Sequence, residues 1–313
     1  MSFKRNPQVF SGSIKEVTIG NGANAVTIGG IKTMPLYSFD APAKHKVAIG
    51  VEISDLGVDR SLPGLAAYYE GAETLAQIAE RASKMPGADF VVLALEGADP
   101  NGENRSVEDC VAEAKEVFEA IDRPLAIIGS KNVEKDTKLF SALAEALQGK
   151  NVLLVSAREE NYKTLGASVV MAYGNKLSAE SAVDINLAKQ LNVLLTQMGI
   201  QPEAFVMNVG SAAAGYGYDY VASTLDRVRS AALSQNDVML QMPIITPVAS
   251  EAWAVKEAVV SEEDIPEWGS RESRGINMEV CTAAAVIAGG SDAVLLMHPQ
   301  SVATISGMIA GLK

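Results

Sequence analysis

The chain has 313 residues, of which 48% are hydrophobic and only 5% aromatic, enough apolar material for one large core or two smaller ones. Its formal net charge of −12 argues against nucleic acid as a partner, because phosphate would be repelled. The N-terminus MSFKRNPQVF lacks the apolar core of a signal peptide and no apolar run approaches the roughly 18 residues of a membrane span, so we expect a cytoplasmic protein without membrane contact.

Residues 15–30, KEVTIGNGANAVTIGG, place Gly20, Gly22 and Ala25 at the G-x-G-x-x-A spacing of a dinucleotide-binding loop. Such a loop follows a buried strand and opens a helix, whereas NAVTIGG is β-branched and ends in glycine. Strand-like runs on both sides therefore predict a β-hairpin, with Asn21 and Gly22 at the positive-φ turn positions. We expect residues 1–44 to form an N-terminal β-hairpin extension rather than a phosphate site.

Apolar runs and helical segments alternate from there to the end of the chain. The runs are 46–53, 90–96, 124–130, 151–157, 168–174, 204–210, 238–247 and 292–299. Most are continuous, which is typical of parallel strands buried on both faces. The intervening segments include helical patterns over 106–121, with Ser106 as N-cap, and over 183–199, with Gly199 as C-cap; 301–313 is the last helix. This order predicts a (β/α)8 TIM barrel over residues 45–313, with a doubly wound open sheet as the alternative.

Cysteine and histidine are scarce. Cys110 and Cys281 fall in predicted helices, where we expect buried, reduced thiols and no cluster or thiolate zinc site. His45 precedes the first strand. His298 stands alone at a strand end, where a hydrogen-bonded structural role is favoured over acid–base chemistry. No lysine is assigned to a strand end, since Lys176 falls in a predicted loop. We therefore predict neither a metal site nor a catalytic nucleophile.

The carboxyl ends of barrel strands carry the chemistry of this fold. Here they offer a polar, mostly uncharged rim of candidate cofactor-binding residues: Ser54, Asp55, Asn175, Asn208 and Thr246. The 44 residues between the seventh and eighth runs form a predicted long loop at the same end and add Arg271 and Arg274, which either contact a ligand or partner or pair locally with Glu272. Glu52 and Glu96 are read as loop caps in preference to a carboxylate pair, and Trp268 as an interface anchor or a pin for its own loop.

Several stretches resemble the small, delta-type subunit of the corrinoid iron–sulfur protein of the acetyl-CoA synthase/CO dehydrogenase system. They are FKRNPQVFSGSIKEVTIGNG, GGIKTMPLYSFDAP leading into KVAIGVEI, GYGYDY, MPIITPVASEAW and WGSRESRGINMEVCTAAAVIAGGSDAVLLMHP. The resemblance covers nearly the whole chain.

This resemblance implies a non-catalytic barrel whose top covers a cobalamin-type corrinoid shared with a large subunit, which alone carries the 4Fe–4S cluster. It implies methyl transfer from methyltetrahydrofolate, through a separate methyltransferase, to acetyl-CoA synthase in the reductive acetyl-CoA pathway of carbon fixation. A reductive activator is a further candidate partner. One rival is a pterin-dependent methyltransferase that binds methyltetrahydrofolate in the barrel, with Asp55 and Asn208 as pterin ligands. A purely structural scaffold is the other.

Overall fold

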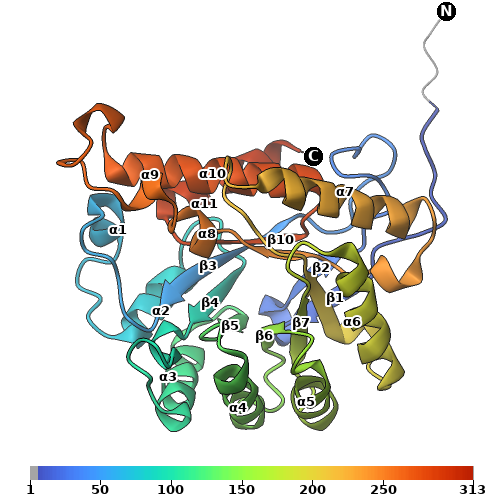
Figure 1. Cartoon of the computed structure of the whole chain (residues 1–313), viewed down its shortest axis with the longest axis horizontal. Helices are drawn as coiled ribbons and strands as arrows, with labels where there is room; N and C mark the ends of the chain where they lie inside the picture. The colour runs from blue at the N-terminus through green and yellow to red at the C-terminus, as the bar shows by residue number, and fades with distance from the viewer. Residues whose placement is uncertain (1–5, 313) are drawn as a thin grey trace, which may run out of the picture.

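The fold is a nearly closed parallel barrel with an added hairpin, seen in a computed structural model that describes residues 6–312 (Figure 1). The parallel sheet has the strand order β8-β7-β6-β5-β4-β3-β10-β9, and an isolated parallel bridge between Met207 and Ile244 links its two ends. The predicted (β/α)8 barrel with an N-terminal hairpin is therefore confirmed. The strands are β3 Ala48–Ser54, β4 Phe90–Ala94, β5 Leu125–Ile128, β6 Leu153–Ala157, β7 Lys176–Glu180, β8 Phe205–Asn208, β9 Ile245–Pro247 and β10 Ala293–Leu296.

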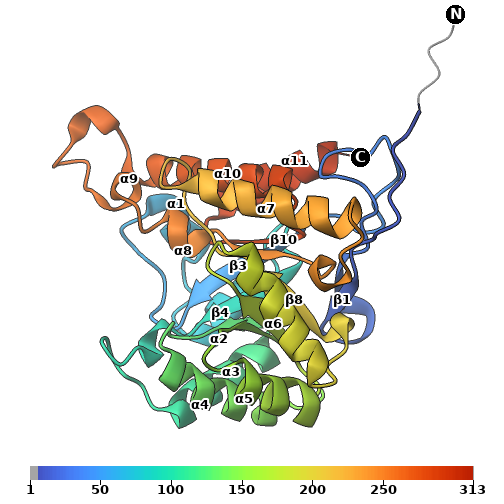
Figure 2. The same cartoon turned by 45° about the vertical axis from the view of Figure 1, so that its right-hand side comes forward.

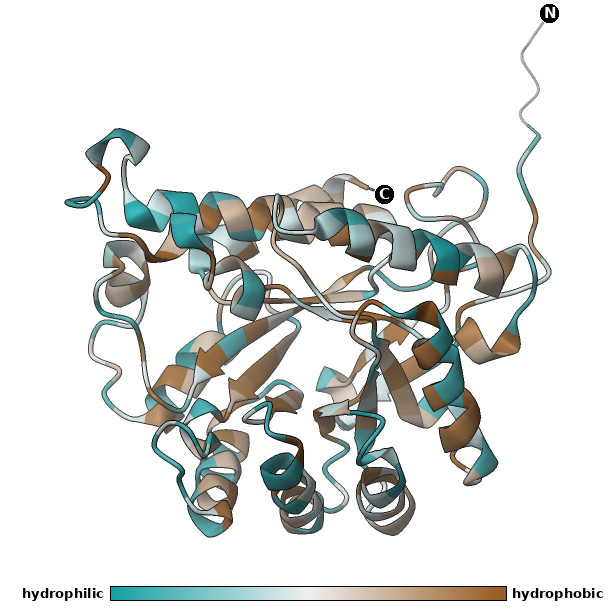
Figure 3. Cartoon of the chain, in the orientation of Figure 1, coloured by the Kyte–Doolittle hydropathy of each residue, from teal (hydrophilic) through white to brown (hydrophobic). Residues whose placement is uncertain are grey.

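Helices surround the barrel, and the strands inside them are largely hydrophobic (Figures 2 and 3). They are α1 Pro63–Tyr68, α2 Leu75–Ser83, α3 Val107–Ala120, α4 Val133–Ala146, α5 Tyr162–Leu165, α6 Ile185–Gln197, α7 Tyr218–Leu233, α8 Ala249–Ala252, α9 Lys256–Val259, α10 Arg271–Gly289 and α11 Pro299–Gly311. Single 3₁₀ turns lie at Gly22–Asn24, Glu96–Ala98, Pro202–Ala204, Val238–Leu240 and Pro266–Trp268.

The helix ends follow the predicted capping chemistry in two places. The Ser106 hydroxyl accepts the Asp109 N–H at the start of α3, and Gly199 follows α6 with φ +92°. Cys110 is buried on α3, but the prediction that both thiols are buried is wrong, because Cys281 lies on an exposed position of α10. None of the helices within residues 6–312 combines the length and apolar character that a bilayer crossing requires.

The hairpin of β1 (Glu16–Ile19) and β2 (Val26–Gly29) closes the amino-terminal end of the barrel. Val17, Ile19 and Ile28 are fully buried and belong to the same cluster as the lumen residues Phe90 and Val206. The extension thus completes the core inside the barrel, whereas the larger cluster lies between strands and helices. The division at residue 44 stays a prediction.

The predicted turn differs in detail from the observed one. Gly20 and Gly22 have φ of +75° and +70°, but Asn21 is extended at −131°. The reason is a longer connection, in which a 3₁₀ turn follows Gly22 and the Asn21 amide donates to the carbonyl of Gly149 at 2.8 Å. The glycine pattern therefore serves the hairpin, and β2 rather than a helix follows it.

The fifth strand is the main error of the sequence analysis. Residues 168–172 of the apolar run at 168–174 belong to a π-helical segment, Gly166–Ala172, which continues α5, and β7 begins only at Lys176. Val169 is fully buried in the cluster between helices and strands, so this run packs as a helix against the outside of the barrel. Gly174, with φ +69°, separates the two elements.

Candidate functional site

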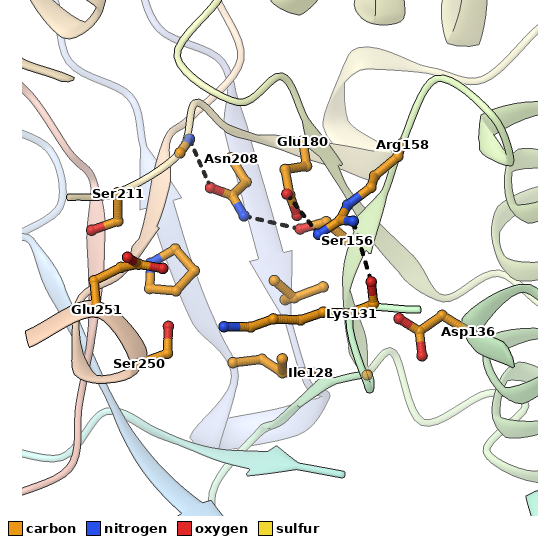
Figure 4. Close-up of a pocket in the computed structure, with 14 residues that line it drawn as sticks. Ile128, Lys131, Asp136, Ser156, Arg158, Glu180, Asn208, Ser211, Ser250 and Glu251 are labelled. Atoms are coloured by element: carbon orange, nitrogen blue, oxygen red, sulfur yellow. Dashed lines mark hydrogen bonds and ion pairs between the residues drawn. The ribbon is translucent and has the colours of Figure 1, made fainter. Parts of the chain in front are cut away.

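A pocket opens at the carboxyl ends of the strands, in the mouth of the barrel (Figure 4). Its cavity volume is about 140 Å³, so it suits a side group of a ligand rather than a whole drug-sized molecule. Strand alternation decides which side chains reach it, because every second residue of a barrel strand points inward. Its lining includes Ile128, Lys131, Asp136, Ser156, Arg158, Glu180, Asn208, Ser211, Pro247, Ser250 and Glu251.

Asn208, at the end of β8, is held in one orientation. Its Nδ2 donates to the Ser156 hydroxyl at 3.1 Å, which in turn donates to Ser178 at 3.2 Å. The N–H of Gly210 donates to Asn208 Oδ1 at 3.0 Å. This chain of hydrogen bonds fixes the uncharged wall of the pocket, so Asn208 lies in the mouth where the sequence analysis expected it.

The charged wall comes from the loops that follow β5 and β6. Arg158 pairs with Glu180 at 3.0 Å, and its Nη1 donates to the backbone carbonyl of Lys131 at 3.3 Å. Lys131 has a left-handed backbone with φ +65°, which is uncommon for a residue with a side chain. Figure 4 shows its ammonium extending into the pocket toward the side on which Ser250 and Glu251 lie.

A carboxyl group lies inside the barrel below the mouth. Its neighbours on β3, Val51 and Ile53, belong to the outer cluster, so Glu52 points inward. Its buried Oε2 has no hydrogen-bond partner among the described residues. Burial raises the pKa of Glu52 to about 8, Glu96 and Glu279 add to the rise, and Lys131 opposes it. Glu52 is therefore mostly protonated at neutral pH, rather than the loop cap that the sequence favoured.

Two predicted rim residues at the end of β3 are engaged with the turn Glu96–Ala98, which follows β4. The Ser54 hydroxyl donates to the Glu96 carboxylate. Both Asp55 oxygens accept the N–H of Gly97, at 3.0 and 3.1 Å, and Arg105 lies 3.7 Å away. Burial raises the pKa of Asp55, while the Gly97 N–H and Arg105 offset part of that effect. Asp55 thus holds the turn after β4 and presents no free oxygen to the mouth.

Two other predicted rim residues are misplaced. Asn175 precedes β7, so it lies at the opposite end of the barrel, where it accepts from Val152 N and donates to the carbonyl of Ala144. The displaced fifth strand causes this error. Thr246 is fully buried and points outward, because its neighbour Ile245 fills the lumen, and its hydroxyl bonds Ser291 at 2.7 Å. The expectation that these two side chains line the mouth is wrong.

Comparison with known proteins places the chain in a family. A family model for the CO dehydrogenase/acetyl-CoA synthase delta subunit matches residues 16–305. The chain belongs to this family. A subunit delta of the acetyl-CoA decarbonylase/synthase complex from Archaeoglobus fulgidus is 31% identical over 99% of this chain and 72% of its own length. Subunit delta 2 from Methanosarcina acetivorans is 30% identical over 93% of this chain and 69% of its own length.

Solved structures support the fold of this delta-family chain. Dihydropteroate synthase from Vibrio fischeri aligns with a TM-score of 0.57 and 11% identity, covering 89% of this chain and 98% of that one. The enzyme from Thermus thermophilus aligns with a TM-score of 0.54 and 12% identity, covering 95% and 100%. At this identity the likeness concerns the barrel and carries no residue roles.

The two predicted loop arginines of the delta-family chain organise residues 248–270, which we call the β9–α10 segment. Both lie in the first turns of α10, not in a loop. Arg271 donates to the carbonyl of Ala258 at 2.8 Å and pairs with Asp59 at 3.2 Å. Arg274 donates to the carbonyls of Glu257, Gly269 and Val260. The guanidinium groups therefore hold the segment in place, and neither pairs with Glu272 as the sequence analysis allowed.

The base of the β9–α10 segment is packed around an indole. Trp253 stacks on His298 with ring centroids 5.8 Å apart, and Gly275 is required there because a Cβ would lie 2.2 Å from the indole. His298 accepts the Gln300 N–H through Nδ1 at 3.1 Å, and its Nε2 lies 3.1 Å from Glu272. Burial lowers the pKa of His298 despite Glu272, so the ring is neutral at neutral pH. Both ring nitrogens are occupied by structural contacts.

Exposed apolar side chains lie at the carboxyl-terminal end of the barrel, on the side formed by β8, β9, β10 and β3. They come from the segments that follow β3, β8 and β9, and they are Leu56, Tyr216, Val259 and Trp268, with exposed fractions of 52%, 47%, 55% and 39%. The Trp268 ring also faces Lys256 and Arg274 at 5.3 and 5.8 Å, so it contacts its own segment while one side stays open. We call these four residues the apolar rim. Apolar groups beside a polar mouth are typical of an interaction surface.

Sequence reasoning missed several residues of the pocket, among them Lys131, Arg158, Glu180 and Glu251. No strand within residues 6–312 ends in lysine, as expected, but Lys131 lies in the loop three residues beyond the end of β5, and Arg158 directly follows β6. Both were visible in the runs PLAIIGSK and NVLLVSAR. The sequence analysis did not identify Glu180 as a strand-end residue, because it placed the strand that carries Glu180 about seven residues too early.

Proposed function

We propose that this chain is the small subunit of a heterodimeric corrinoid methyl carrier and that its barrel mouth covers a corrinoid held by a larger subunit. The observation that carries the proposal is the apolar rim at the same end of the barrel as a polar pocket, presented by a member of the delta family. A corrin ring has apolar faces and an amide-bearing edge, so an apolar rim with polar groups beside it suits the ring. The Ser211 hydroxyl, in the pocket wall, and the Glu52 carboxyl below it each have a buried oxygen without a hydrogen-bond partner among the described residues.

The chain's own residues contribute shielding and not bond chemistry in this proposal. When bound, the corrinoid supplies a cobalt centre that accepts and releases a methyl group. Leu56, Val259 and Trp268 would exclude water from the covered face, which protects a reduced centre. The Tyr216 hydroxyl donates to Glu257 at 2.6 Å, so it ties the segment after β8 to the β9–α10 segment and keeps the rim continuous.

The proposed partners follow from the assignment of this chain as the small subunit of a corrinoid methyl carrier. The methyl group comes from methyltetrahydrofolate through a separate methyltransferase and passes to acetyl-CoA synthase. The 4Fe–4S cluster, and any reductive activator that acts on it, belong with the large subunit. Asn208 stays a candidate for direct corrinoid contact, because it lines the pocket. The other candidates act only through the segments that they position, and they are Ser54, Arg271 and Arg274. Asp55, Asn175 and Thr246 make hydrogen bonds within the barrel.

Val259→Asp tests the covering role. We expect it to raise the Kd of this chain for the corrinoid-loaded large subunit by about tenfold or more, because a carboxylate would be buried without a partner. The matched control is Val238→Asp, since Val238 is 50% exposed and precedes β9, at the other end of the barrel. The Kd can be measured by titration with labelled large subunit. Equal effects of the two variants, or equal affinity for loaded and empty large subunit, would contradict the proposal.

The pterin-dependent methyltransferase remains the rival function. The barrel has the fold of dihydropteroate synthases, and Asn208 lies in the mouth. Asp55, its expected pterin partner, is occupied by Gly97 and Arg105. We therefore expect calorimetric titration of the isolated chain with methyltetrahydrofolate to show no binding in the micromolar range. Saturable micromolar binding that Asn208→Ala abolishes would favour the enzyme.

A further inference from the structure

The Lys131 ammonium is a charge in the pocket without a partner. No carboxylate of residues 6–312 lies within ion-pair distance of it, and no hydrogen bond to it is formed within that part of the chain. Its backbone is nevertheless fixed. Arg158 donates to its carbonyl, and the preceding Ser130 is held by Asp136, which accepts from both its N–H and its hydroxyl at 2.8 and 2.7 Å. A strained, left-handed backbone therefore holds a free cation at the mouth.

The opposite wall offers an acceptor. Glu251, on α8, lines the pocket and its carboxylate makes no ion pair or hydrogen bond with another described residue. The Ser211 hydroxyl beside it is buried and unpartnered. Lys131 and Glu251 are too far apart to pair directly, since ion pairs reach 4.0 Å and none joins them. The space between them is the pocket shown in Figure 4.

The remaining charged side chains of the pocket already have partners. Arg158 is paired with Glu180, and Asp136 is hydrogen-bonded to Ser130. Glu52, beneath Lys131, has a pKa raised to about 8, so at neutral pH it is mostly a protonated carboxyl that does not compete for the ammonium. One free cation and one free anion thus face each other across the opening.

A ligand group that suits this arrangement is neutral and carries both an acceptor and a donor. A bare carboxylate would be attracted by Lys131 and repelled by Glu251, and an ammonium would meet the reverse. A primary carboxamide accepts a hydrogen bond from Lys131 through its oxygen and donates one to Glu251 through its nitrogen, with charge assistance on both sides. Lys131 is exposed and Glu251 half-buried in the free chain, so a ligand would cover both, and a carboxamide leaves neither covered charge unpaired.

We propose that this pocket, between Lys131 and Glu251, receives one of the acetamide or propionamide side chains at the edge of the corrin ring. This inference rests on the proposed function, because that function brings a macrocycle with primary amides to the mouth. The amide fixes the rotational position of the ring under the apolar rim. Lys131 and Glu251 are positioning residues in this role, since they contact the edge of the ring and not its reacting centre.

The test uses the complex of this chain with the large subunit, loaded with cobalamin or with cobalamin monocarboxylates in which one peripheral amide is hydrolysed to a carboxylate. The readout is the Kd of this chain for each loaded subunit. We expect one monocarboxylate to bind about tenfold more weakly than cobalamin, because its carboxylate faces Glu251. Glu251→Gln should restore that affinity, and Lys131→Met should weaken binding of cobalamin by a similar factor.

Glu263→Gln is the matched control, because Glu263 lies exposed on the same segment, and it should leave the whole series unchanged. If every monocarboxylate binds like cobalamin, and neither pocket variant changes the Kd, the amide pocket is overturned while tighter binding of loaded than of empty subunit still supports the covering role. If loaded and empty subunits bind equally, the proposed function fails, and this inference fails with it.

Discussion

Arg229→Ala is expected to lower the free energy of unfolding by about 3–5 kcal/mol, the usual cost of breaking a buried ion pair from one side. Arg229 on α7 and Asp292, which precedes β10, are 2% and 1% exposed and lie 2.5 Å apart. Arg229 also donates to the carbonyl of Gly290, and Asp292 accepts the N–H of Ile244 at 2.7 Å. The variant would leave the Asp292 carboxylate buried and unpaired at the point where the barrel closes.

Urea denaturation followed by circular dichroism measures this loss. The control is Lys189→Ala, which breaks the pair with Asp237 at 2.6 Å. Because Lys189 is half exposed, that change should cost no more than about 1 kcal/mol. A loss below about 1 kcal/mol for Arg229→Ala would show that the buried pair contributes no more than a surface one.

Glu52→Gln is expected to stabilise the protein increasingly as the pH rises. The folded pKa of Glu52 is raised from 4.5 to about 8, so the folded state binds this proton more tightly than the unfolded state. The stabilisation from the protonated carboxyl is complete below pH 4.5, declines by about 1.4 kcal/mol for each pH unit above it, and is lost as the pH rises through 8. Glutamine does not titrate, so the variant should gain about 3 kcal/mol on the native protein between pH 4.5 and pH 7.

Free energies of unfolding at pH 4.5, 7 and 9 give the comparison. Glu134→Gln is the matched control, because the Glu134 side chain is 85% exposed and its pair with Lys138 lies on the surface. Its effect should be small at every pH. If the Glu52→Gln difference does not grow with pH, the carboxyl is solvated in the folded protein and the buried, unpartnered oxygen is not a feature of the mouth.

The errors of the sequence analysis have a common physical cause. An apolar run can pack as a strand in the sheet or as a helix against it, and periodicity does not separate the two over seven residues. The run around Val169 lies in a helix, while the true strand KLSAE alternates, with Leu177 and Ala179 packed outward and Ser178 and Glu180 facing the inside of the barrel near its mouth. This one displacement moved Asn175 to the wrong end and hid Glu180.

The candidate site also contains some features that the sequence predicts and others that it does not. Asn208 and Ser156 follow clear strands, so their place at the mouth was predictable. That Asp55 is occupied by Gly97 was not predictable, because the loop N–H groups that meet it lie 42 residues away in the chain. The sequence also could not predict that the Lys131 ammonium has no ion-pair partner among the described residues, because this depends on the positions of all neighbouring side chains in the fold.

The sequence by itself determined the barrel, its hairpin and the end at which polar residues gather, because hydrophobic periodicity and turn chemistry are local properties of the chain. The tertiary structure alone decided which of those residues remain available. Packing between distant segments engages Asp55, Thr246 and Arg274 in internal hydrogen bonds. It leaves the side chains of Lys131 and Glu251 in the pocket without such partners among the described residues. Burial, which depends on the whole fold, decides that Glu52 keeps its proton at neutral pH.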